Sequence, residues 1–153
     1  MTAVEKGKAF GSASTLVAQM GILLGMVVSN QSQPALVVAS AASAISGSFG
    51  DAFSMYISET TVKTQEPLVP AVSVLITKLV IGAVYVLLFA ILGKSHYILA
   101  IAILLTLSLL YYLSMMAQGD YKNVNKTFLQ YIVLTTLVVA LTSSFGFAIR
   151  GAF

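Results

Sequence analysis

The chain has 153 residues, of which 58% are hydrophobic and only 8% are charged, and its net charge at neutral pH is +3. Soluble globular domains carry about 25% charged residues, so this composition excludes an ordinary water-soluble domain and favours a membrane protein. The basic residues are scattered rather than gathered in a tract, which argues against nucleic acid as a partner. Because the chain contains no cysteine, disulfides, thiolate metal sites and a cysteine nucleophile are also excluded.

Five apolar stretches follow one another along the chain, and each is long enough to cross the hydrocarbon core of a bilayer. They cover residues 11–29, 34–58, 69–92, 97–117 and 127–149. The polar segments between them are short, so consecutive helices are expected to run antiparallel. The sequence therefore predicts an all-α fold: an integral, multi-pass bundle of five transmembrane helices that forms a single domain over residues 1–153.

The positions of lysine and arginine predict the orientation of this bundle, because cytosolic loops retain an excess of positive charge. With the N-terminus in the cytosol, the cytosolic side holds Lys6, Lys8, Lys63, Lys122 and Lys126. The opposite side then holds only Lys94 and Arg150. We therefore expect a cytosolic N-terminus and a C-terminus on the opposite side of the membrane.

The second stretch differs from the others because residues 37–54 are largely Ala, Ser and Gly. Small residues let helix backbones approach closely, and such surfaces drive helix association in a bilayer. We expect this helix either at the centre of the bundle or in a dimer interface, although the pattern also fits a helix that serves only packing. The last three stretches, rich in Leu, Ile, Val and Tyr, are expected to face lipid.

Two ionisable residues, Asp51 and Lys78, fall inside the apolar stretches, where an unpaired charge costs several kcal/mol. The helical rise places them about 10 and 16 Å from the same membrane face, a difference that a lysine side chain can bridge. One interpretation is a buried ion pair with a purely structural role. In the other, Asp51 binds a cation or carries a proton, and Lys78 is a gate or a substitute for the absent cation. A pair that opens when a metal arrives would satisfy both.

Met55 follows Asp51 by one helical turn, so a carboxylate and a thioether share one face. This mixed donor set suits Fe(II) or another borderline transition metal better than Ca(II) or Mg(II). A methionine on a helix, however, is more often a packing residue. Gln19, on the first helix at comparable depth, could join Asp51 and Lys78 or could form an ordinary interhelical hydrogen bond.

The segment after the second stretch carries two further carboxylates, Glu59 and Glu66, which could collect cations. A solvated loop is the simpler interpretation of that segment. The single histidine, His96, lies in a predicted loop without other ligands nearby and predicts no metal site. No Ser/His/Asp set, phosphate loop or pair of catalytic acids can be assembled, so we expect neither an enzyme nor a permanently bound cofactor.

Residues 47–66, GSFGDAFSMYISETTVKTQE, followed by PLVPAV, resemble the vacuolar iron transporter family. The second helix of that family typically reads G-A-L-S-M-A-x-G-E-Y-x-S and continues into a charged cytosolic segment. The resemblance covers essentially the whole chain. The matching positions are Gly47, Tyr56 and Ser58 in this helix, with Gly25 and Gly82 at glycine positions of the first and third helices.

The chain departs from the family pattern in four respects. Met55 stands where the family has its glutamate and Asp51 where it has its methionine, so the acid and the thioether are exchanged by one turn. Ser14 replaces the intramembrane aspartate of the first helix, and Lys78 replaces an apolar residue. The large cytosolic metal-binding domain of many members shrinks here to residues 59–66.

The resemblance implies a homodimer, formed through the first two helices, that exports Fe(II) or Mn(II) from the cytosol in exchange for protons. Asp51 and Met55 would then bind the transported ion, with Gln19 beside them and Ser14, Glu59 and Glu66 as weaker candidates. A lysine in the pathway repels cations unless Asp51 neutralises it. A second interpretation therefore stays open: a membrane protein that keeps the fold without transporting metal, in which Asp51 and Lys78 form a structural pair or a route for protons or another small solute.

Overall fold

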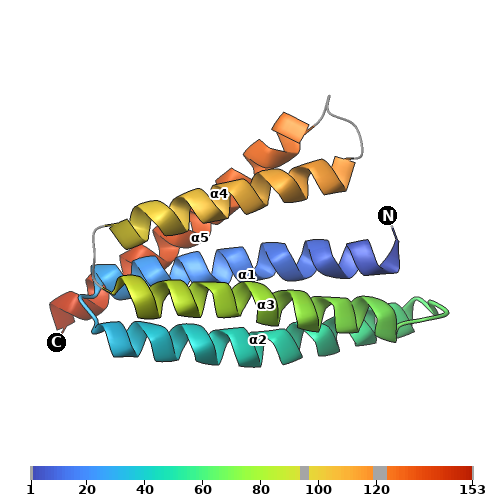
Figure 1. The fold of residues 1–153 in the computed structure, drawn as a ribbon, viewed down its shortest axis with the longest axis horizontal. Coiled ribbons are helices and arrows are strands. Elements are labelled where there is room, and N and C mark those ends of the chain that lie inside the picture. Colours follow the sequence, from blue (N-terminus) through green and yellow to red (C-terminus); the bar gives the residue numbers. More distant parts are fainter. Residues whose placement is uncertain (1, 94–96, 119–123, 153) are drawn as a thin grey trace.

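A computed structural model describes residues 2–93, 97–118 and 124–152, and within them it contains five α-helices and no strand (Figure 1). The helices are α1 (Ala3–Val28), α2 (Gln33–Thr61), α3 (Leu68–Leu92), α4 (Tyr97–Gln118) and α5 (Val124–Ala152). All five are long and apolar enough to cross a membrane, which confirms the predicted all-helical, multi-pass membrane protein. His96, Lys94 and Lys122 lie outside the described residues.

The chain reverses direction at each connection, so the two termini lie at opposite ends of the bundle (Figure 1). Each helix is longer than the apolar stretch that predicted it, and the largest differences lie at the start of α1, the end of α2 and both ends of α5. Helix α1 begins at Ala3 because Thr2 and Glu5 form a capping box. The Glu5 amide donates to Thr2 Oγ1, and the Thr2 amide donates to the Glu5 carboxylate. The end of α2 lies at Thr61, so Glu59 belongs to a helix and not to the loop that we expected.

The central helix of the bundle is α1, which packs against all four of the other helices. In the described residues, α2 lies at one edge and contacts only α1 and α3, while α5 lies at another edge against α1 and α4. The expectation that the small-residue helix α2 occupies the centre is therefore wrong. The alternative, that α2 lies in a dimer interface, stays a prediction.

Glycines at both ends of α1 explain its central position. Gly7 and Gly11 face α3, where a Cβ on Gly7 would lie 2.4 Å from the Pro70 carbonyl oxygen. At the other end of α1, Gly25 meets α5, where a Cβ on Gly146 would lie 2.7 Å from the Gly25 carbonyl oxygen. Because backbones touch at both places, α1 accommodates a neighbour on each side.

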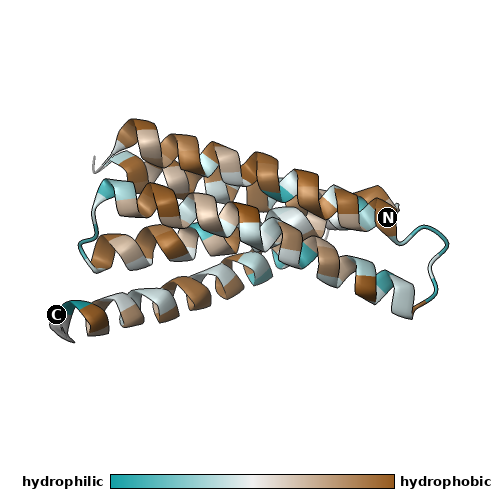
Figure 2. Cartoon of the chain, turned by 90° about the horizontal axis from the view of Figure 1, so that it is seen from below, coloured by the Kyte–Doolittle hydropathy of each residue, from teal (hydrophilic) through white to brown (hydrophobic). Residues whose placement is uncertain are grey.

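The apolar core lies mainly between α1, α3 and α4 and includes Leu16, Leu23, Tyr85, Phe89, Ala102 and Leu110. Many other large apolar side chains are exposed. In Figure 2 hydrophobic residues colour the length of the helices, and the connections between helices are mostly hydrophilic. This outer surface includes Phe49 and Phe53 of α2 as well as residues of α3 to α5. The lipid-facing surface is therefore not confined to the last three helices.

Candidate functional site

Three side chains from three helices meet inside the bundle: Ser14 of α1, Asp51 of α2 and Lys78 of α3. Lys78 Nζ donates to Asp51 Oδ2 at 2.5 Å and to Ser14 Oγ at 2.9 Å, and Ser14 Oγ donates to Asp51 Oδ2 at 2.5 Å. We call these residues the polar triad. Each lies within about 6 Å of the midpoint of its helix, measured along the axis at 1.5 Å per residue. The triad is therefore near the middle of any bilayer that the helices span.

Lys78 is almost fully buried, with 4% of its surface exposed. Two glycines make room for its long side chain: a Cβ on Gly11 would lie 3.4 Å from Lys78 Cγ, and a Cβ on Gly47 would lie 3.4 Å from Lys78 Nζ. A lone ammonium at this depth would cost several kcal/mol, so Asp51 and Ser14 are the partners that allow Lys78 to be charged here.

Asp51 is the open side of the triad. Its side chain is 30% exposed, and both hydrogen bonds that it accepts converge on one oxygen, Oδ2. Within the described residues, Oδ1 accepts none. A carboxylate oxygen without a hydrogen-bond partner, on a side chain that is partly exposed, can serve as a ligand for a cation.

Met55 and Gln19, the other proposed ligands of the site, lie apart from the triad. Met55 continues the Asp51 face of α2 but is 8% exposed and packs against Ala52, Ala71 and Val74. Gln19 pairs instead with Ser40 of α2: its Nε2 donates to the Ser40 carbonyl at 3.2 Å, and Ser40 Oγ donates to its Oε1. Gln19 thus forms the interhelical hydrogen bond that was the alternative interpretation.

Glu59 differs most from the expectation of a solvated loop. It is 5% exposed, forms an ion pair with Lys6 of α1 through Oε1, and accepts a hydrogen bond from Thr64 Oγ1 at 2.8 Å through Oε2. The correction arises because α2 continues past Glu59, two turns beyond Asp51 on the same face. Glu66 is exposed in the α2–α3 connection and forms no ion pair with the described residues.

Sequence reasoning missed the partners Lys6 and Thr64. From its position in the sequence, Lys6 indicates only the orientation of the bundle. The usable signal was the spacing of Asp51 and Glu59, which are eight residues apart and therefore share one helix face.

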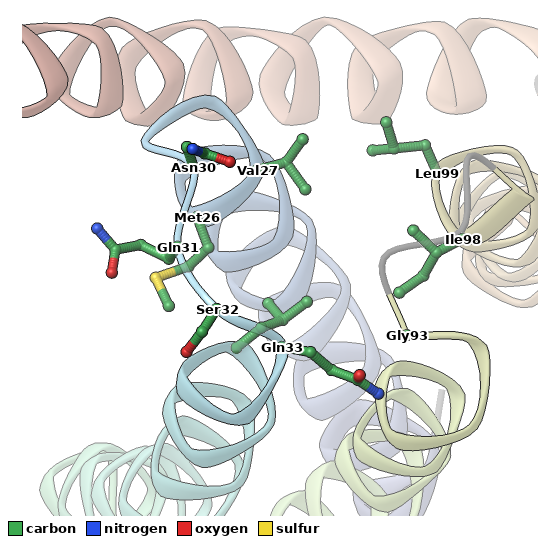
Figure 3. Close-up of a pocket in the computed structure, with 10 residues that line it drawn as sticks. Met26, Val27, Asn30, Gln31, Ser32, Gln33, Gly93, Ile98 and Leu99 are labelled. Atoms are coloured by element: carbon green, nitrogen blue, oxygen red, sulfur yellow. The ribbon is translucent and has the colours of Figure 1, made fainter.

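Among the cavities of the described residues, one lies at an end of the bundle and another lies beside the triad. One, of about 180 Å³, is enclosed by the α1–α2 connection, the end of α3 and the start of α4 (Figure 3). There Gln33 extends toward Gly93, and its Nε2 donates to the Phe89 and Ala90 carbonyls that end α3. Met26 on its wall is about 18 Å along α1 from Ser14, so this cavity is separate from the triad.

A second cavity, of about 430 Å³, lies between α1, α4 and α5 and reaches the triad through Ser14. Its walls are almost entirely apolar, so it offers no path for an ion. Thr135 lines it, and Thr135 Oγ1 is buried without a hydrogen-bond partner in the described part of the chain.

No group of three or more His, Cys, Asp or Glu side chains among the described residues could hold a metal ion. A cation at the triad would therefore rely on oxygens of Asp51 and Ser14 and would take the place of the Lys78 ammonium. Comparison with known proteins finds no matching family model, no matching curated protein and no matching solved structure. Fold and site together define a five-helix membrane protein with an ion pair near mid-membrane.

Proposed function

We propose that the protein transports divalent transition-metal ions, Fe(II) or Mn(II), out of the cytosol, with its N-terminus on the cytosolic side. The observation that carries the proposal is the Asp51 carboxylate, which lies near mid-membrane, is 30% exposed and keeps Oδ1 uncommitted within the described residues. Intramembrane carboxylates of this kind mark ion pathways because their burial is otherwise unfavourable. The resemblance to vacuolar iron transporters supports the same assignment.

In this proposal the Lys78 ammonium occupies the cation site when no metal ion is bound. A metal ion that binds Asp51 Oδ2 and Ser14 occupies the position of Nζ, which must then withdraw, because two cations so close repel strongly. When the metal leaves, the ammonium returns and the carboxylate is not left unpaired in a low-dielectric environment. The resemblance to vacuolar iron transporters implies that the metal moves in exchange for protons.

A homodimer would cover the open side of Asp51. Beside it, α2 carries a stripe of small, exposed or half-buried residues: Ala39, Ser43, Ser46, Gly50 and Ser54. A Cβ on Gly50 would meet nothing within 4 Å, so a second helix can approach closely there. We therefore propose a pathway between two copies that meet mainly through α2, with α1 behind it, and that shield the Asp51 oxygen from lipid.

A second candidate function follows from the same contacts. Lys78 is hydrogen-bonded to both of its partners, and Met55 packs in an apolar cluster rather than beside the triad. These features favour a protein that keeps the fold without moving metal, in which the pair is structural or serves a proton or another small solute.

Uptake of Fe(II) and Mn(II) into proteoliposomes, with and without a pH gradient, tests the proposal. We expect uptake by the wild type and its loss in Asp51→Asn, with Glu5→Gln as a control carboxylate that is exposed and outside the triad. Lys78→Met separates the two candidates: raised metal uptake indicates that Lys78 competes with the ion, whereas misfolding indicates a structural pair. A folded wild type that takes up neither metal would overturn the transport proposal.

A further inference from the structure

A second lysine–carboxylate pair closes one end of the bundle, where α1 begins and α2 ends. Lys6 Nζ donates to Glu59 Oε1, and Thr64 Oγ1 donates to Glu59 Oε2 at 2.8 Å. Both oxygens of Glu59 are thereby engaged, in contrast to Asp51. We call Lys6, Glu59 and Thr64 the latch.

The two charged members of the latch differ in exposure. The Lys6 side chain is 51% exposed, whereas that of Glu59 is 6% exposed. The Lys6 ammonium is already half solvated, so its own transfer into water costs little. Glu59, which its partners cover, is then left as an anion that a different cation can reach.

The latch and the triad lie in series along one face of α2. Glu59 follows Asp51 by eight residues, which corresponds to about 12 Å, and Met55 lies between them. Each acid is neutralised by a lysine from another helix, Lys6 of α1 or Lys78 of α3. Between Asp51 and Glu59, the Met55 side chain packs against Ala71 and Val74 of α3.

We propose that Glu59 is a second cation-binding residue on the route to Asp51 and that Lys6 is a removable plug, whose ammonium holds the position until a divalent cation displaces it. The identity of the cation rests on the proposed function. The closure of the bundle end by Lys6 does not depend on the proposed function, because it follows from the contacts of the latch alone.

The absence of native cysteine allows a direct test, because a single introduced cysteine is the only thiol in the protein. Val74→Cys places this reporter at a position that is 0% exposed, one turn from Lys78 and below the latch. In proteoliposomes, a membrane-impermeant, positively charged methanethiosulfonate reports its accessibility. We expect Lys6→Met to accelerate modification by about tenfold, as a population shift toward the open latch requires.

Lys8→Met is the matched control, because Lys8 is exposed near the same helix end and forms no ion pair with the described residues. It should leave the rate unchanged. Addition of Mn²⁺ should accelerate modification with the latch intact and have no effect in Glu59→Gln. Thr64→Val removes the hydrogen bond to Glu59 Oε2 and should also accelerate modification of the cysteine. It replaces Lys6→Met if that variant does not fold.

Unchanged modification in Lys6→Met and Thr64→Val, with a lowered melting temperature, would show that the latch merely staples α1 to α2 and would overturn the plug. Accelerated modification in these variants without any response to Mn²⁺ would overturn Glu59 as a cation-binding residue. These outcomes are independent of metal uptake, so failure of the latch and failure of the proposed transport are distinguishable.

Discussion

A Cβ added to Gly82 of α3 would lie 2.5 Å from the Cβ of Ala44 on α2, so the two helices touch at this level without intervening side chains. The contact lies one turn beyond Lys78 on α3. It therefore fixes the spacing of the two helices at the place where Lys78 must reach Asp51.

Replacement of Gly82 by valine should force the helices apart. Overpacking of this kind costs about 1–3 kcal/mol, and here it also lengthens the Lys78–Asp51 contact. Ala83→Val, on the exposed side of the same helix, is the control and should be nearly neutral. Thermal unfolding in detergent, followed by circular dichroism, measures the difference. Equal melting temperatures for the two variants would contradict the close approach of α2 and α3.

The pairing of Asp51 and Lys78 makes a double-mutant cycle informative. Asp51→Asn leaves a buried ammonium without its counter-ion and should destabilise by about 3–5 kcal/mol, since breaking a buried pair exposes the cost of the remaining charge. Lys78→Met should also destabilise, because it leaves the Asp51 carboxylate near mid-membrane with Ser14 as its remaining partner. The double variant should regain much of the loss. Strictly additive effects in thermal unfolding would argue against the pair.

The five helices and the contact between Asp51 and Lys78 could be predicted, because both follow from strong constraints. A span needs about 20 apolar residues, and a charge inside it needs a partner. The central helix could not be predicted in this way. Composition counts small residues but does not show which face they occupy. The dense Ala/Ser/Gly run of α2 therefore outweighed the glycines at both ends of α1, where this helix closely approaches α3 and α5. Glu59 was misplaced because hydropathy detects the edge of the apolar core and not the end of a helix.

Thr135 offers a test of packing that does not depend on function. Its hydroxyl is buried and has no hydrogen-bond partner in the described residues, whereas Thr106 and Ser114 bond to carbonyls one turn earlier. An unsatisfied hydroxyl costs about 1–3 kcal/mol, so the isosteric Thr135→Val should raise the melting temperature. Thr106→Val should lower it, because the bond to Tyr85 is lost. Destabilisation by Thr135→Val would show that its hydroxyl has a partner in the membrane.

The small-residue stripe of α2 predicts where two copies meet. Gly50→Cys should form a disulfide-linked dimer on mild oxidation in membranes, because position 50 has open space around it and lies beside Asp51. Val133→Cys on α5, where the native side chain is 56% exposed, should face lipid and remain monomeric. If the dimer forms there, Gly50→Leu should weaken association by blocking close approach, while leaving the fold of each copy intact. Cross-linking through Val133→Cys in preference to Gly50→Cys would move the interface to α5 and leave the uncommitted oxygen of Asp51 uncovered, which would remove the structural support for a pathway between subunits.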